Sequence, residues 1–427
     1  MKIAILAPNF FLEVAELSGK DRILYGGGER YLYELWRNLT EKGHVVDIYQ
    51  PLRSPNTVDE YGKRHNVPFG QIAKNYKGMK VICIENNERW EYGVNPKLNM
   101  YFNEIGSFYD LRIYYTTYMA YPFALNPSIS VCHGIYWDYP HFVYNIADEN
   151  VRQEYFKRHL YGFTAPDICV SVDSNVKKVI KAIKPGADSN IHIIYNFVDT
   201  NVFKPVEKNE SDVVNIICPR RLTTLRGCNE FIKLYREHVE ETKSEIMSTE
   251  EYKTFSDSDV PDDFQKAVDY LGDKLKEKLK YNFVSVGAAA NEESGQNFIS
   301  YYKGSPNIRF VDTDMDGMVA LYQEADISVI PTMACEGLSL SSLESMSCGL
   351  PVITTPVGGL GDSIIHGYNG FIYDPQYESL HDYVRVLGRN RSLRKLLGRR
   401  GREIAIESFD ISIWREKWSN VINLFRR

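Results

Sequence analysis

Two glutamates carry the clearest chemical signal in the chain. Glu336 and Glu344 lie in the stretch PTMACEGLSLSSLESMSCGLPVITTPVGGLG, residues 331–361. Carboxylates accept hydrogen bonds from paired hydroxyl groups, such as those of ribose or of another sugar. A nucleotide sugar offers hydroxyl pairs at both ends and a diphosphate between them. The alternative for Glu344 is an ordinary helix glutamate near the favourable end of the helix dipole.

The elements expected around these glutamates form a strand–loop–helix–strand unit. The apolar run 325–330 is expected as a buried strand, and 352–354 as the next one. Ser339 is expected as the N-cap of a helix over 340–347, which Gly349 ends. Such a unit directs the free amides of the helix N-terminus toward the strand ends. An anionic group, most simply a phosphate, is the natural ligand there.

The complete pattern resembles the donor-site signature of the retaining glycosyltransferases of the GT-B fold, family 4 (glycosyl transferases group 1). Members typically show E-G-F-G-L-x-x-L-E-A-M-A-C-G-x-P-V, followed by G-G and an acidic residue. The matching residues are Glu336, Gly337, Leu340, Leu343, Glu344, Met346, Cys348, Gly349, Pro351, Val352, Gly358 and Gly359. Leu338 and Ser339 replace the usual Phe and Gly, and Asp362 stands where Glu is common.

The resemblance implies an α/β protein of two Rossmann-like domains with parallel sheets that face a cleft, and a C-terminal helix that crosses back to the first domain. It also implies transfer of a sugar from a nucleotide-diphosphate sugar to a hydroxyl acceptor, with retention at the anomeric carbon. Glu344 is then expected to hold the ribose hydroxyls and Glu336 those of the transferred sugar. Gly337, Leu340 and Ser341 complete the expected donor site around the helix N-terminus.

Two arginines follow the first predicted strand of the second domain, in PRRLTTLRG at 219–227. Family members read G-R-L here, with a lysine five residues after the arginine, and Arg221 and Arg226 fit that spacing. Arg226 keeps the charge of the usual lysine, and its guanidinium fork can hold two phosphate oxygens. The pair is expected to bind the diphosphate and to stabilise the charge that grows as the nucleotide leaves. Two solvated surface arginines are the alternative.

Three further positions are expected at the donor site. Gly27 and Gly28 precede a predicted helix, and family members carry a glycine-rich loop there that faces the diphosphate. A simple tight turn is the alternative. YNFVD at 195–199 resembles the family's N-G-V-D element, with Phe197 in place of glycine. Asn196 is therefore expected either to line the cleft or to mark a simple domain-exit turn.

The stretch CHGIYWD at 132–138 follows a predicted strand. A lone histidine after a strand is usually structural, but the family places one here near the donor sugar. His133 is therefore expected to position the sugar rather than to transfer a proton. Tyr136 and Trp137 are candidates for stacking on acceptor sugars, because aromatic rings offer an apolar platform with a polar tip. Asp138 is a candidate to accept a hydrogen bond from the acceptor.

Composition limits the other functions. The 427 residues carry 50 basic and 56 acidic side chains, a net charge of −6, which argues against general nucleic-acid binding. The seven cysteines form no C-x-x-C pair, and no histidine cluster has metal-ligand spacing, so neither a metal site nor a cofactor is expected. No stretch approaches the roughly 20 apolar residues of a membrane-spanning helix, and a cytoplasmic location is expected.

A basic cluster between Arg389 and Arg402 leaves two interpretations open. A solvated helix face is the simpler one. The alternative is a peripheral contact with the anionic inner face of the membrane, since each basic side chain near such a surface contributes ~1 kcal/mol.

Short apolar runs alternate with amphipathic segments, a pattern typical of parallel Rossmann-like sheets, and the length favours two domains. We place an acceptor-binding domain at 1–204, a nucleotide-sugar-binding domain at 205–408 and the crossover helix at 409–427. The charged insertion at 240–280 is assigned no chemistry. Strands are expected at 3–7, 45–49, 80–84, 112–116, 129–133, 168–172 and 191–195 in the first domain, and at 213–218, 282–286, 308–311, 327–330 and 352–354 in the second.

Two other functions stay open. A nucleotide-sugar epimerase of the GT-B fold would need no acceptor, and a non-catalytic nucleotide-sugar-binding protein would bind without turnover. The sequence specifies neither the sugar and base of the donor nor the acceptor, the linkage or the oligomeric state. A glycan or lipid-linked glycan acceptor, in cell-surface polysaccharide biosynthesis, is the expectation drawn from the family.

Overall fold

The chain forms two compact units. The computed structural model describes residues 1–8, 26–51, 72–76, 78–84, 94–135, 148–208, 211–248, 275, 277–287, 293–334 and 336–426. The first unit comprises Met1–Asn196, Cys335–Leu338 and Ile411–Arg427, and the second comprises Phe197–Ala334 and Ser339–Asp410. The first unit thus ends at Asn196 rather than at 204, and two later segments of the chain return to it.

The first unit is built on an eight-stranded sheet with the order β3-β4-β2-β1-β5-β6-β7-β8. Its strands are β1 (Lys2–Leu6), β2 (Val45–Pro51), β3 (Ile72–Tyr76), β4 (Met79–Ile84), β5 (Leu111–Tyr114), β6 (Ser128–Cys132), β7 (Ile168–Ser171) and β8 (Ile191–Ile193). All neighbours pair in parallel except β3, which pairs antiparallel with β4. The seven predicted strands are confirmed with ends shifted by a residue or two, and β3 adds an edge that was not predicted.

The second unit has a six-stranded, fully parallel sheet with the order β11-β10-β9-β12-β13-β14. Its strands are β9 (Val214–Cys218), β10 (Tyr281–Val286), β11 (Ile308–Val311), β12 (Ile327–Ile330), β13 (Val352–Thr354) and β14 (Gly370–Ile372). The central strands β12 and β13 are buried at every position, because helices cover both faces of a parallel sheet. Both Rossmann-like sheets of the prediction are therefore confirmed.

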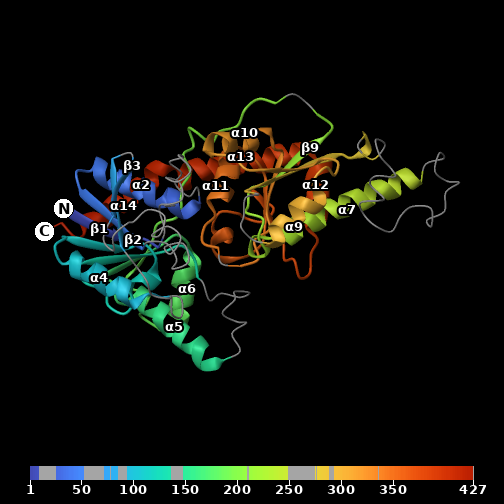
Figure 1. Ribbon diagram of the computed structural model, residues 1–427. Helices are drawn as coiled ribbons and strands as arrows, with labels where there is room; N and C mark the ends of the chain where they lie inside the picture. Colours follow the sequence, from blue (N-terminus) through green and yellow to red (C-terminus); the bar gives the residue numbers. More distant parts are fainter. Residues whose placement is uncertain are drawn as a thin grey trace. The chain divides into compact units, whose positions relative to one another are not determined.

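The C-terminal helix packs within the first unit. Helices of this unit are α2 (Gly27–Glu41), α4 (Pro96–Gly106), α5 (Glu149–Thr164), α6 (Ser174–Ile183) and α14 (Ile411–Asn423), with a short 3₁₀ turn, η1 (Thr117–Ala120). Helix α14 lies beside α2 (Figure 1), where buried Trp418 donates a hydrogen bond from Nε1 to the hydroxyl of Tyr31 at 2.8 Å. Arg415 pairs with Glu34 of α2 at 2.7 Å. The predicted return of the C-terminal helix to the first domain is confirmed.

A carboxylate caps one helix of the first unit. The N-cap of α6 is Asp173, one residue before Ser174. Its carboxylate accepts a hydrogen bond from the backbone N–H of Val176 at 2.9 Å. Both residue types can cap, and the carboxylate also favours the positive end of the helix dipole.

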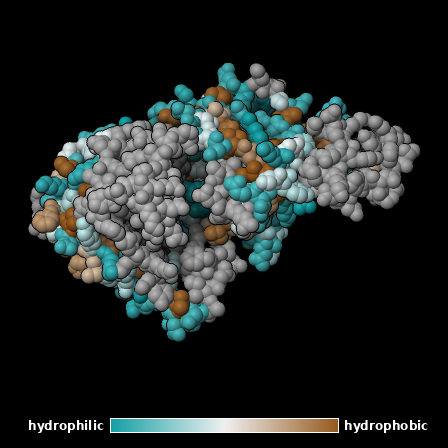
Figure 2. Space-filling view, in the orientation of Figure 1, coloured by the Kyte–Doolittle hydropathy of each residue, from teal (hydrophilic) through white to brown (hydrophobic). Residues whose placement is uncertain are grey.

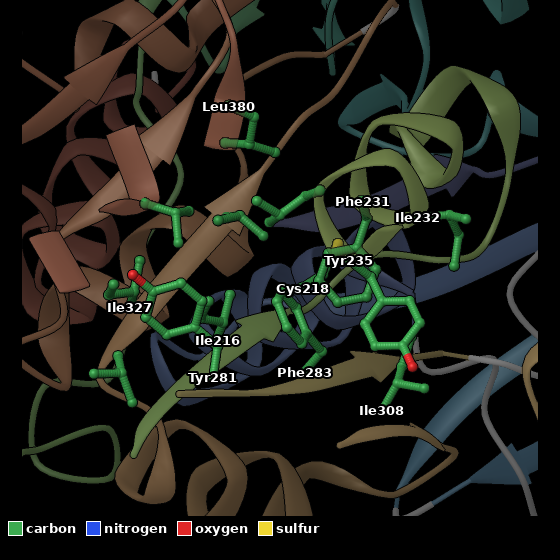
Figure 3. Close-up of a cluster of buried hydrophobic side chains, with 14 of the residues drawn as sticks. Ile216, Cys218, Phe231, Ile232, Tyr235, Tyr281, Phe283, Ile308, Ile327 and Leu380 are labelled. Carbon is green, nitrogen blue, oxygen red and sulfur yellow. The ribbon is translucent and has the colours of Figure 1, made fainter. Parts of the chain in front are cut away.

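Aromatic and aliphatic side chains from both faces of the sheet fill the core of the second unit. The helices of this unit are α7 (Cys228–Met247), α9 (Glu293–Tyr302), α10 (Met315–Glu324), α11 (Leu340–Ser347), α12 (Leu380–Arg389) and α13 (Arg391–Phe409), with the 3₁₀ turns η3 (Thr224–Arg226) and η5 (Gly358–Asp362). Phe231 and Tyr235 of α7 pack edge-to-face on Phe283 of β10, with ring centroids 6.1 and 5.4 Å apart (Figure 3). The helix over 340–347 is confirmed residue for residue as α11.

Hydrophilic residues dominate the described surface on the face shown in Figure 2, and hydrophobic residues form small separate patches there. Within the described residues, no helix combines the length and the apolar character needed to cross a bilayer.

Gly227 fixes the turn between η3 and α7. It has a φ of 80°, in the left-handed region that favours glycine. A Cβ placed on it would lie 1.8 Å from the carbonyl oxygen of Pro331. The loop that carries Arg226 is thus seated directly on the backbone that follows β12.

We predict that Gly227→Ala lowers the free energy of unfolding by about 3 kcal/mol, because it combines a left-handed alanine with a displaced neighbour. Gly304→Ala is the matched control in the same unit, since Gly304 also has positive φ but nothing within 4 Å of an added Cβ. Its loss should be only about 1–2 kcal/mol. Urea unfolding followed by circular dichroism measures both, and equal losses would contradict the role of the Pro331 contact.

Candidate active site

His133 directly follows β6, at the carboxyl end of the first sheet. Its ring lies between two aromatic side chains of the same unit. Tyr31 of α2 meets it edge-on with centroids 5.0 Å apart, and Tyr115, after β5, lies at 4.6 Å. The carboxyl ends of β5 and β6 and the first half of α2 therefore hold the imidazole in one orientation.

The environment keeps the His133 ring neutral at pH 7. Burial lowers its pKa to about 4, and a hydrogen bond to the backbone of Tyr115 opposes this only in part. The other ring nitrogen, Nε2, is buried and has no hydrogen-bond partner among the described residues. With Nδ1 donating to the backbone, Nε2 is an acceptor, and it can receive a hydrogen bond from a hydroxyl group. This chemistry suits positioning rather than proton transfer.

The segment that carries Glu336 packs on the turn after β6. A Cβ on Gly337 would lie 2.5 Å from the carbonyl oxygen of His133 and 2.7 Å from a methyl group of Val172. Only glycine permits this approach, which explains the E-G pair physically. A Cβ on Gly134 would in turn lie 3.0 Å from the carbonyl carbon of Glu336, so the backbones of Glu336 and the histidine turn are in contact.

Asn196 fastens the other end of this segment. Its side-chain amide donates a hydrogen bond to the carbonyl oxygen of Leu338. Its Oδ1 is buried and has no hydrogen-bond partner among the described residues, so it is a second acceptor in the same unit without a protein donor. Asn196 ends the first segment of the first unit, and the chain leaves this unit after it. The same residue also contacts the segment that carries Glu336.

The two glycines of the predicted phosphate loop lie inside a helix. Gly27 and Gly28 form the first turn of α2, and Gly26 is its N-cap without a side-chain hydrogen bond. Both glycines therefore belong to the helix itself rather than to a loop before it. The hydroxyl of Tyr115 donates to the carbonyl oxygen of Gly28. The exposed start of α2 is thus linked through Tyr115 to His133. The role of both glycines at the donor site stays a prediction.

Tyr136, Trp137 and Asp138, the candidates for acceptor binding, lie outside the described residues.

In the second unit, a guanidinium group lies at the N-terminus of α11. Arg220 donates from Nη1 to the hydroxyl of Ser339 at 3.0 Å. Ser339 is confirmed as the N-cap residue, but its hydroxyl makes no hydrogen bond to the helix amides. Ser341 is turned back to the carbonyl oxygen of Pro219, to which it donates at 3.0 Å. Uncapped amides beside a cation are a favourable environment for an anion.

The predicted pair Arg221 and Arg226 lies on the loop that follows β9. Arg221 is exposed, and Gly287 at the end of β10 lies behind its backbone, where a Cβ would be 3.4 Å from the Arg221 Cα. Arg226 ends η3 and is partly exposed. A backbone hydrogen bond of 2.9 Å from Met333 to Leu225 ties this loop to the one after β12. Arg220 was not singled out from the sequence, because the motif favoured its neighbour.

Glu344 lies on α11 and is almost fully buried, with 5% of its surface exposed. Its Oε2 accepts a hydrogen bond from the hydroxyl of Tyr322 at 2.8 Å. Burial and the neighbouring carboxylate raise the pKa of Tyr322, so the phenol stays a donor. The carboxylate is therefore held in place, and its contact with a ribose stays a prediction.

The basic cluster between Arg389 and Arg402 is partly engaged within the second unit. Arg394 donates to the carbonyl oxygens of Leu387 and Gly388 at 2.6 and 2.9 Å. Arg402 donates to the backbone at Thr200, Phe203 and Ser347. Both guanidinium groups are therefore tied to the backbone of this unit.

Two family models match the chain. "Glycosyltransferase Family 4" matches residues 25–202, and "Glycosyl transferases group 1" matches residues 256–404. The first match covers much of the first unit, including His133 and Asn196. The second covers Glu336 and Glu344 but begins after the two predicted arginines.

The curated relatives include two glycosyltransferases and a synthase. The chain is 24% identical to the uncharacterized glycosyltransferase MJ1069 of Methanocaldococcus jannaschii over 94% of this chain and 95% of the relative. It is 32% identical to MJ1178 of the same organism over a match that spans 33% of this chain and only 40% of the relative. N-acetyl-alpha-D-glucosaminyl L-malate synthase of Bacillus anthracis is 24% identical over 58% of this chain and 57% of the relative.

Solved structures share the architecture. Sucrose-phosphate synthase of Thermosynechococcus elongatus superposes with a TM-score of 0.68 at 16% identity, over 99% of this chain and 98% of the other. Anabaena HepE in complex with UDP-glucose superposes with a TM-score of 0.63 at 14% identity, over 99% of both chains. At such identities the likeness concerns the fold. Together with the family matches, it shows that the chain is a GT-B glycosyltransferase of family 4, within the glycosyl transferases group 1.

Proposed function

We propose that the protein transfers a glycosyl group from a nucleotide-diphosphate sugar to a hydroxyl acceptor, with retention at the anomeric carbon. The observation that carries the proposal is the N-terminus of α11, where uncapped amides lie beside the Arg220 guanidinium. A diphosphate is the anion that such a site favours in a parallel α/β unit.

In this proposal, the second unit holds the nucleotide. Arg221 and Arg226 bind the diphosphate and stabilise the negative charge that develops on it as the glycosidic bond breaks. Amides at Leu340 and Ser341 contribute to the same task, and Arg220 orients the start of the helix through Ser339. Glu344, held by Tyr322, accepts hydrogen bonds from the ribose hydroxyls.

The sugar-binding groups come from the first unit. The carboxylate of Glu336 and Nε2 of His133 lie on backbone segments in contact, and each can accept a hydrogen bond from a sugar hydroxyl. Gly27, Gly28, Gly337 and Asn196 shape this part of the site. Catalysis then rests on orientation and charge stabilisation, with His133 neutral throughout.

Relatives suggest the chemical class of the substrates. The solved structures of HepE contain UDP or UDP-glucose, and a matching relative from Staphylococcus aureus is named a capsular polysaccharide biosynthesis glycosyltransferase. We infer a nucleotide-sugar donor and a glycan or lipid-linked glycan acceptor, as used in cell-surface polysaccharide biosynthesis. The acceptor would use Tyr136, Trp137 and Asp138.

An epimerase of the same fold and a binding protein without turnover are the two alternative functions, and each treats the donor differently from a transferase. An epimerase converts its donor without an acceptor, and a binding protein leaves the donor unchanged. Chromatography of a donor incubation without acceptor separates both from a transferase, which releases free nucleotide by slow hydrolysis.

We predict that one class among UDP-, GDP-, TDP- and ADP-sugars stabilises the protein. At a ligand concentration 100 times the Kd, binding adds about 2.7 kcal/mol to the free energy of unfolding. A thermal-shift screen measures this as a higher unfolding midpoint. If no nucleotide sugar or free nucleoside diphosphate shifts the midpoint, the proposed donor site is wrong.

We predict that Arg221→Ala and Arg226→Ala each weaken diphosphate binding by ~1.5–3 kcal/mol, because each removes a charge-assisted hydrogen bond. Titration calorimetry with the nucleoside diphosphate from the screen measures the loss. Arg309→Ala is the control, since Arg309 is an exposed arginine of the same unit that pairs with Glu324 at 2.6 Å. Unchanged affinity in either test variant would remove that arginine from the site.

Glu336→Gln should slow release of the sugar by about 10- to 100-fold and leave the affinity for the free nucleoside diphosphate unchanged, since the proposal gives Glu336 contacts to the sugar alone. Glu324→Gln is the control and should match the wild type. Proton NMR of the first-formed product should show the anomeric configuration of the donor. An inverted product would refute retention without affecting donor binding.

A further inference from the structure

Three metal-ligating side chains gather between α7 and α12, and none of them belongs to the proposed transfer site. His238 and Glu241 are three residues apart on α7, so they lie on the same face of the helix. His381 is the second residue of α12. One ligand atom from each side chain lies within 4.8 Å of the other two.

The environment of His238 is unusual for a buried histidine. The residue is 3% exposed, and neither ring nitrogen has a hydrogen-bond partner among the described residues. Leaving a buried polar atom without a partner costs about 1–3 kcal/mol. Its ring stacks at a tilt on Tyr281, with centroids 4.4 Å apart. Phenylalanine would supply that contact without the cost, so packing alone does not explain a histidine here.

The two carboxylate oxygens of Glu241 have different neighbours: one faces two arginines, and the other faces His381. Oε1 faces the guanidinium groups of Arg385, at 3.4 Å, and Arg389, at 3.8 Å. Oε2 lies 3.3 Å from Nε2 of His381, and the two atoms do not form a regular hydrogen bond. Ligand atoms that share a tetrahedral Zn²⁺ at about 2.0–2.1 Å lie roughly 3.3 Å apart. This pair already has the separation of two ligands.

We propose that His238, Glu241 and His381 bind a Zn²⁺ ion, with a water molecule as the fourth ligand. Two imidazoles and one carboxylate are a set that suits zinc, and a rotation of the His238 side chain closes the tetrahedron. The ion would join the second half of α7 to the start of α12, two helices that contact each other in the second unit. Arg385 competes with the ion for Glu241, so the structure predicts moderate rather than tight binding.

The test uses the full-length protein without a histidine tag, stripped with EDTA and titrated with ZnCl₂ by calorimetry. We expect one site per chain and a rise in the unfolding midpoint, because the ion binds the folded state. CoCl₂ in place of zinc should give the visible absorption bands of a tetrahedral site. His381→Gln should weaken binding by more than the roughly 10–100-fold that loss of an outer partner causes.

Glu241→Gln is the second variant, since this partly exposed position tolerates an amide and keeps the protein folded. It should abolish the cobalt bands, and Arg385→Gln should strengthen binding. His192→Gln, which changes a histidine of the first unit, is the control and should bind as the wild type does. Absence of one-to-one binding, or binding that survives both His381→Gln and Glu241→Gln, would overturn the proposal. Neither result would affect donor binding.

Discussion

The approach of Gly337 to the carbonyl group of His133 is the contact on which the rest of the site depends. It leaves no space for a side chain, so the loop between β12 and α11 must touch the end of β6 through bare backbone. The hydrogen bond from Asn196 to Leu338 holds the same loop from the other side. Glu336 therefore belongs to the same unit as the neutral histidine, although the helix that follows belongs to the other unit. A backbone fixed in this way avoids the conformational entropy that ordering a flexible loop would cost.

In the second unit, neighbouring polar side chains position the charged groups near α11. The N-terminus of α11 has no side-chain cap, since Ser339 and Ser341 are turned toward Arg220 and Pro219. Polar residues that elsewhere satisfy helix amides here position a cation and leave the amides for a ligand. The buried hydroxyl of Tyr322 donates a hydrogen bond to Glu344, and this contact orients the carboxylate without neutralising its charge. In the proposed function, this geometry is present before the donor binds, which is the condition for electrostatic catalysis.

Much of this architecture could be predicted from the sequence, because a parallel strand buried on both faces is a short continuous apolar run. Prediction from the sequence fails where two neighbouring residues could both fill the same structural role. Asp173 and Ser174 are both capping residues, and only the backbone angles choose between them. Arg220 and Arg221 are neighbours, and the strand before them determines which guanidinium meets Ser339. Tertiary contacts make both choices. They also bring His238, Glu241 and His381 together, and no local motif predicts this cluster because α12 is far from α7 in sequence.

The first unit is assembled from three separate stretches of chain, and the last of them contains α14. Trp414 and Trp418 of α14 fill the space against Tyr31 of α2. During synthesis the strands of the first unit can pair as they emerge, but α2 keeps an apolar face uncovered until α14 has been made. Loss of α14 would therefore damage the unit to which the early strands belong and leave the six-stranded sheet with all of its strands.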